Sequence, residues 1–85
     1  MEDKKFTLNY FRQEYTAFRD IMCSRKYSID DKLTYWGGLI FCYVNLEKLQ
    51  KEEEEQVQMS MLALQNEFNM RMGYQAAIEI QEILN

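Results

Sequence analysis

The spacing of apolar residues in the first third of the chain predicts an amphipathic helix over residues 7–25. Thr7 stands directly before this pattern, and its hydroxyl can accept a hydrogen bond from a first-turn amide, so we expect it to be the N-cap. Phe6 and Phe11 then occupy the two positions of a hydrophobic staple. The apolar positions recur at intervals of three and four residues, as on one face of an α-helix: Leu8, Phe11, Tyr15, Phe18 and Met22.

A second helix is predicted over residues 29–50, with a different pattern of apolar positions. Ser28, followed by two aspartates, is typical of a helix start. Between residues 33 and 49 the apolar side chains surround the helix almost completely, so this segment must be covered on several sides. Gly37 and Gly38 lie inside it and predict either a break or a close approach by another backbone.

A third helix is predicted over residues 54–84. Gly73 falls within it and predicts an end or a kink. Glu67 and Arg71 have the spacing of an intrahelical ion pair. A sustained apolar stripe runs along this segment: Val57, Met61, Leu64, Phe68, Met72, Ala76, Ile80 and Ile83.

The segment between the second and third helices supports two interpretations. Residues 50–56 contain no apolar side chain, which favours a connector in a bent chain. The same residues include no glycine, proline, asparagine, aspartate or serine, and their charges are spaced as i, i+4 pairs. The alternative is therefore a single rod over residues 29–72, about 65 Å long at 1.5 Å per residue, which would require a dimer.

Composition fixes the fold class as all-α. The chain has 85 residues, no proline and three glycines, too few turn-forming residues for a sandwich or barrel. This length accommodates one domain, residues 1–85. We expect a small helical bundle or helical hairpin of about three helices, with one long helix in a dimer as the alternative.

Missing residue types argue against catalysis and metal binding. There is no histidine, and Cys23 and Cys42 have no further cysteine or histidine to complete a metal shell. We therefore expect a non-enzymatic protein with no catalytic residue, cofactor or metal. The first residues contain no apolar signal-peptide segment. The two cysteines are thus expected to be free, buried thiols of a cytoplasmic protein.

Charge and hydropathy restrict the partners. The longest apolar stretch, residues 35–44, is about half of the ~20 residues that span a bilayer, so no membrane contact is expected. Residues 1–33 carry seven basic and six acidic side chains, whereas residues 34–85 carry three basic and eight acidic ones. No basic stripe exists for nucleic acid. The acidic run is either a solvated helix face or a patch that docks on a basic partner: Glu52, Glu53, Glu54 and Glu55.

Four further side chains are candidates for protein binding. Tyr35 and Trp36 stand beside two glycines, and aromatic residues dominate the energetics of protein interfaces. Met59 and Met70 lie off the apolar stripe of the third helix, so we expect them to face outward or onto a partner. The competing interpretation of all four is that they fill the core.

Trp36, Gly37 and Gly38 match the W-x-G motif of the WXG100 family, and in these three residues the chain resembles that family. The family consists of small helical hairpins that Gram-positive bacteria secrete, with the motif in the turn between two long helices. In this sequence a helical pattern precedes the motif, and an apolar run follows it instead of a polar turn. The resemblance implies a secreted helical hairpin.

Together these features favour a protein–protein interaction module, expected to be a homodimer, that regulates or inhibits another protein. Small size, acidity and a composition rich in Lys, Glu, Asn, Tyr and Ile are also typical of inhibitors encoded by phages or mobile elements. The main alternative is an acidic mimic of DNA that occupies a DNA-binding protein.

Overall fold

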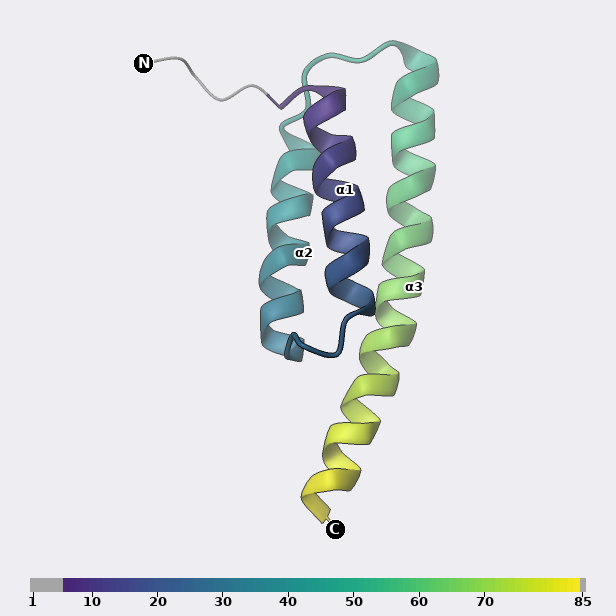
Figure 1. The fold of residues 1–85 in the computed structure, drawn as a ribbon. Coiled ribbons are helices and arrows are strands. Elements are labelled where there is room, and N and C mark those ends of the chain that lie inside the picture. The colour runs from purple at the N-terminus through teal and green to yellow at the C-terminus, as the bar shows by residue number, and fades with distance from the viewer. Residues whose placement is uncertain (1–5, 85) are drawn as a thin grey trace, which may run out of the picture. The chain divides into compact units, whose positions relative to one another are not determined.

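The computed structural model describes residues 6–84, and these residues form three α-helices and no strand (Figure 1). The helices are α1 (Leu8–Cys23), α2 (Ile29–Val44) and α3 (Lys51–Leu84). The all-α prediction is confirmed. Residues 1–5, part of the segment in which no signal peptide was expected, lie outside the described residues. Contacts divide the chain into two compact units, the first ending at Lys51 and the second beginning at Glu52.

The start of α1 is built as predicted. The Thr7 hydroxyl accepts a hydrogen bond from the Tyr10 amide at 3.1 Å, which satisfies one of the unpaired donors of the first turn. The Phe6 ring packs edge-on against Tyr10 at 5.8 Å and against Phe41 of α2 at 5.5 Å, measured between ring centroids. Phe6 therefore links the beginning of α1 to the C-terminal part of α2.

A short turn makes α1 and α2 antiparallel neighbours (Figure 1). The Ser24 amide donates to the Ile21 carbonyl at 3.1 Å and ends α1 two residues before the predicted boundary. The Ser28 hydroxyl accepts from the Asp31 amide at 3.1 Å, so Ser28 is the N-cap of α2. At the other end of the hairpin, the Glu47 amide donates to the Phe6 carbonyl at 2.9 Å and ties the two segments together.

Helix α2 runs without interruption through Gly37 and Gly38, so the predicted break is wrong. The helix ends at Val44, before the predicted boundary at residue 50, and the Asn45 side-chain amide donates to the Phe41 carbonyl at 2.8 Å. Residues 46–50 are not helical, and α3 begins at Lys51. The rod interpretation is therefore wrong, and the segment between the two helices is a connector.

The buried side chains of the hairpin come from both of its helices. Aromatic rings of α1 meet those of α2: Phe18 lies 5.2 Å from Trp36, and Phe11 lies 6.3 Å from Tyr43, centroid to centroid. Such pairs stabilise a small core beyond the area that they bury. The fully buried apolar members are Phe11, Phe18 and Met22 of α1, and Leu39 and Cys42 of α2.

Both cysteines are free, but only Cys42 is buried. The prediction of two buried thiols is wrong for Cys23, which is exposed at the last position of α1. Successive helix residues are rotated by about 100°. The residue after the buried Met22 therefore points away from the core.

In α3 the predicted stripe is buried over its N-terminal half, at Val57, Met61, Leu64 and Phe68. The stripe does not stay buried toward the C-terminus, where Ile80 and Ile83 are 57% and 83% exposed. The helix continues past Gly73, so this glycine does not end it.

Candidate protein-interaction surfaces

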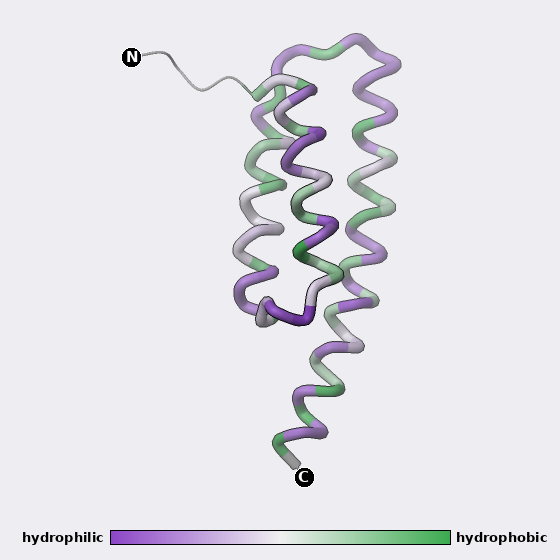
Figure 2. The backbone as a smooth tube through the Cα atoms, in the orientation of Figure 1, coloured by the Kyte–Doolittle hydropathy of each residue, from purple (hydrophilic) through white to green (hydrophobic). Residues whose placement is uncertain are grey.

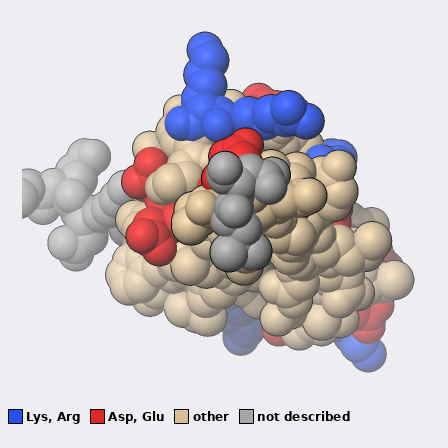
Figure 3. All heavy atoms as spheres, turned by 90° about the horizontal axis from the view of Figure 1, so that it is seen from below, with Lys and Arg blue, Asp and Glu red and all other residues tan. Residues whose placement is uncertain are grey.

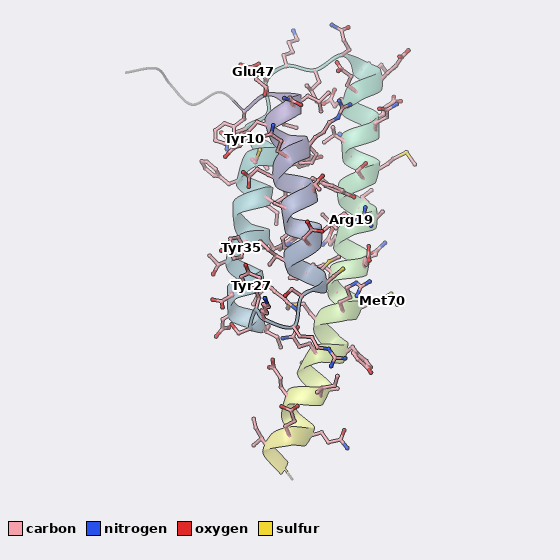
Figure 4. The ribbon with its side chains drawn as sticks, viewed as in Figure 1. Tyr10, Arg19, Tyr27, Tyr35, Glu47 and Met70 are labelled. Atoms are coloured by element: carbon pink, nitrogen blue, oxygen red, sulfur yellow. The ribbon has the colours of Figure 1, made fainter. Side chains whose placement is uncertain are left out.

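The adjacent candidates Tyr35 and Trp36 have different environments. Trp36 is half-buried, and its ring is tilted by 41° against the buried Phe18. Tyr35 is 47% exposed and stands at 87° to the Tyr27 ring, 5.8 Å away (Figure 4). Trp36 therefore belongs to the packing of the hairpin, whereas Tyr35 lies at its surface.

The four glutamates lie at the beginning of α3. Glu52, Glu54 and Glu55 are exposed, and Glu53 is half-buried. The N-terminal end of a helix carries a partial positive charge, which stabilises acidic side chains in the first turn. Helix formation thus accounts for this run of charge without a binding partner.

Met59 and Met70 are 71% and 77% exposed, as expected for residues off the apolar stripe. They are eleven residues apart, close to three helical turns, so they lie on the same side of α3. Leu62 and Tyr74 are 62% and 70% exposed and flank the same side. We call these four residues the methionine face; Met70 projects from α3 in Figure 4.

The methionine face lies on the side of α3 away from its buried residues Val57, Leu64 and Phe68. Between its members the exposed positions on this side are small or uncharged: Ala63, Asn66, Gly73 and Ala77. An ion pair between Arg71 Nε and Glu67 Oε1, 3.1 Å apart, lies beside the methionine face. The helix therefore has two largely apolar sides, of which one is buried and the other exposed.

A second exposed apolar surface lies on α2. We call it the α2 face, and its members recur at helical spacing: Leu33, Gly37, Ile40, Phe41 and Val44. Sequence reasoning recognised that this segment is apolar all round but did not name these residues as candidates for binding. They can be identified by elimination. Leu39 and Cys42 are buried and Trp36 is half-buried, and these positions form the core side of α2, so the remaining apolar positions lie on its exposed side.

Gly37 lies near the centre of the α2 face, and packing within the chain does not account for it. A β-carbon built on Gly37 meets no heavy atom within 4 Å. Glycine in a helix interior costs about 1 kcal/mol relative to alanine. No charged residue occurs between Leu33 and Val44, and the hydrophobic colour is continuous over much of the C-terminal half of α2 (Figure 2).

Charged groups contribute little that resembles a binding site. Residues other than Lys, Arg, Asp and Glu cover most of the side shown in Figure 3, with the largest group of Lys and Arg side chains at the upper edge and others at the right and lower edges. Lys32 is charged and yet only 5% exposed, in the first turn of α2, a burial that sequence reasoning missed. Its methylene stem can line apolar neighbours while the ammonium group reaches a polar partner.

The described residues contain neither a cluster of metal ligands nor a membrane-spanning helix. Within residues 6–84, no group of three or more His, Cys, Asp or Glu side chains is arranged to hold a metal ion. None of the helices in that range combines the length and the apolar character needed to cross a membrane.

No family model, no curated protein and no solved structure matches this chain. The structure also limits the resemblance carried by Trp36, Gly37 and Gly38. These residues lie in the middle of α2 and not in a turn between two helices, so the position of the motif differs from that in the WXG100 family.

Proposed function

We propose that the protein is a non-enzymatic interaction module of the cytoplasm that binds another protein through the methionine face and thereby regulates or inhibits it. The observation that carries this proposal is the exposure of four large apolar side chains on one side of α3: Met59, Leu62, Met70 and Tyr74.

The size of the methionine face supports a binding role. With full side-chain areas on the order of 150–250 Å², the exposed fractions correspond to about 500–600 Å² of surface. The largest apolar patch of a typical monomer is about 300–600 Å² and is often functional. One side of a standard interface buries about 800 Å², so this face can supply most of one side.

The chemistry of the face also indicates the kind of partner. Methionine is flexible and polarizable, so it adapts to an apolar surface of irregular shape. The residues between its members are small or uncharged, so the only charges beside them are those of Glu67 and Arg71, which are already paired with each other. We therefore expect an apolar groove or an amphipathic helix on the partner, and an affinity that changes little with salt.

A charge-insertion variant tests this proposal. Wild-type protein, Met59→Lys/Met70→Lys and the control Gln65→Lys are immobilised and used to capture proteins from the native host. Gln65 is exposed on α3 outside the methionine face. Far-UV circular dichroism first verifies that all three are equally helical.

The expected result is a protein retained by wild type and Gln65→Lys but lost with Met59→Lys/Met70→Lys. Retention of every captured protein by the double variant would exclude the methionine face as the binding site.

A further inference from the structure

We infer that the α2 face is the contact between two copies of this chain, which cross in antiparallel orientation at Gly37. This surface lies on a different helix from the methionine face, and the inference does not depend on the proposed partner binding. It identifies a second copy of the chain as the occupant, on grounds of charge, of close approach at Gly37 and of exposed area.

The first reason is the charge of the chain. Each copy carries a formal net charge of −4, so two copies repel each other, and this repulsion is weakest for a contact surface without acidic groups. The α2 face has no charged residue from Leu33 to Val44, and the nearest acidic groups on α2 are Asp30 and Asp31 in its first turn. A self-complementary surface without charge also leaves no ion unpaired when it is buried.

The orientation follows from the acidic start of α2. Asp30 and Asp31 are exposed in its first turn. A parallel dimer would bring the two pairs of carboxylates together. An antiparallel dimer separates them by the helix length, about 20 Å, which is about two Debye lengths at physiological salt.

Gly37 allows the two helices to approach closely. Leu33 lies four residues before it and Phe41 four residues after it, so the three form one ridge with a notch in its centre. The open space around Gly37 is available to the corresponding ridge of the second copy. Leu33 of one copy then lies near Phe41 of the other.

The exposed area is sufficient for a weak dimer. The exposed fractions are 45% for Leu33, 37% for Ile40, 59% for Phe41 and 68% for Val44. They correspond to about 400 Å² of apolar surface per copy, or roughly 800–1,000 Å² for both with the adjoining backbone, near the lower limit of specific interfaces. We therefore expect a dimer that dissociates in the micromolar range.

Glycine variants test the site by sedimentation equilibrium over a range of concentrations. Gly37→Ala adds one methyl group in the proposed contact. It should raise the dissociation constant at least tenfold while raising the melting temperature of the dilute protein, because alanine favours the helix. The matched control is Gly73→Ala, since Gly73 is also exposed in a helix with open space around it. It should raise the melting temperature without changing the dissociation constant.

A wild-type mass of 10.3 kDa at all concentrations up to the millimolar range would overturn the inference. A dimer weakened by Gly73→Ala and not by Gly37→Ala would also overturn it, because the contact would then lie on α3.

A charge exchange tests the antiparallel orientation. Leu33→Glu and Phe41→Lys each place an unpaired charge in the contact, so either variant alone should dissociate at least ten times more readily than wild type. Both positions are exposed. The new Glu lies toward the N-terminal end of α2 and the new Lys toward its C-terminal end, where the helix dipole favours a negative and a positive charge, respectively. In an equimolar mixture the new Glu and Lys meet across an antiparallel contact, and dimers should reappear. A mixture that dimerises no better than its components would overturn the antiparallel arrangement.

Discussion

Replacement of Trp36 by alanine should strongly destabilise the hairpin formed by α1 and α2. The side chain is half-buried on α2, and its ring lies 5.2 Å from the buried ring of Phe18 on α1. Removing it eliminates an aromatic contact between the two helices and leaves a cavity beside Phe18. The adjacent Tyr35, also a candidate for partner binding, is 47% exposed and provides a matched comparison.

The expected cost follows from the buried area. Truncation of a half-buried tryptophan to alanine removes about 100–150 Å² of buried apolar surface, which corresponds to about 2.5–4 kcal/mol at 25 cal/mol per Å². The lost ring pair adds about 0.5–1.5 kcal/mol. We therefore expect the free energy of unfolding to fall by about 3–5 kcal/mol, which is a large part of the ~4–13 kcal/mol available to a chain of this size.

Thermal and urea unfolding followed by far-UV circular dichroism measure this loss. At about 4–8 °C per kcal/mol, the melting temperature of Trp36→Ala should fall by roughly 12–40 °C. Trp36→Phe retains a ring near Phe18 and should recover about half of the loss. Tyr35→Ala should cost only about 1 kcal/mol, because much of its ring is already in water.

A different pattern would refute the packing argument. If Trp36→Ala unfolds within 1 kcal/mol of wild type, the contact with Phe18 contributes little. If it also loses partner binding or dimerisation while its helicity is intact, Trp36 is an interface anchor and not a structural residue.

Three further changes test the caps, thiols and acidic run. Ser28→Ala removes the acceptor of a capping hydrogen bond and should lower the free energy of unfolding by about 1 kcal/mol in urea titrations. Cys23 should react with a thiol reagent within seconds, whereas Cys42 should react only upon unfolding; equal rates would contradict their different burial. Glu53→Lys/Glu54→Lys should cost about 1 kcal/mol or less by thermal melting and leave partner affinity unchanged at low salt. Weaker binding would instead favour the DNA-mimic alternative.

The sequence predicted the helices and their caps because those signals are local. Thr7 and Ser28 each accept a hydrogen bond from an amide three residues later, a geometry that depends only on the adjacent chain. The end of α2 was harder to predict. The i, i+4 charge pairs of residues 47–55 are compatible with a continuous helix, but each is worth only a few tenths of a kcal/mol. The structure instead ends α2 at Val44, and the side-chain amide of the C-cap residue Asn45 donates to the Phe41 carbonyl.

The exposed surfaces were only partly predictable, because a sequence pattern shows that a side chain is apolar but not which apolar side is covered. Met59 and Met70 could be identified because they depart from a clear stripe in α3. In α2 nearly every position from 33 to 44 is apolar or small, so periodicity could not separate Leu39, which is buried, from Val44, which is 68% exposed. That distinction required the packing of α1 against α2.

The chain leaves two apolar helix faces exposed while its net charge is −4. Acidic groups are concentrated at helix starts, at Asp30 and Asp31 in α2 and at Glu52–Glu55 in α3. In these positions they stabilise the helices and give the chain a repulsive net charge, while the α2 face and the methionine face stay free of charge. Because neither face carries a charge, no ionic contact can select its partner. The partner surface must therefore match the face in shape. This separation of charge from contact area is the physical basis of both proposals, self-association through α2 and binding of a different protein through α3.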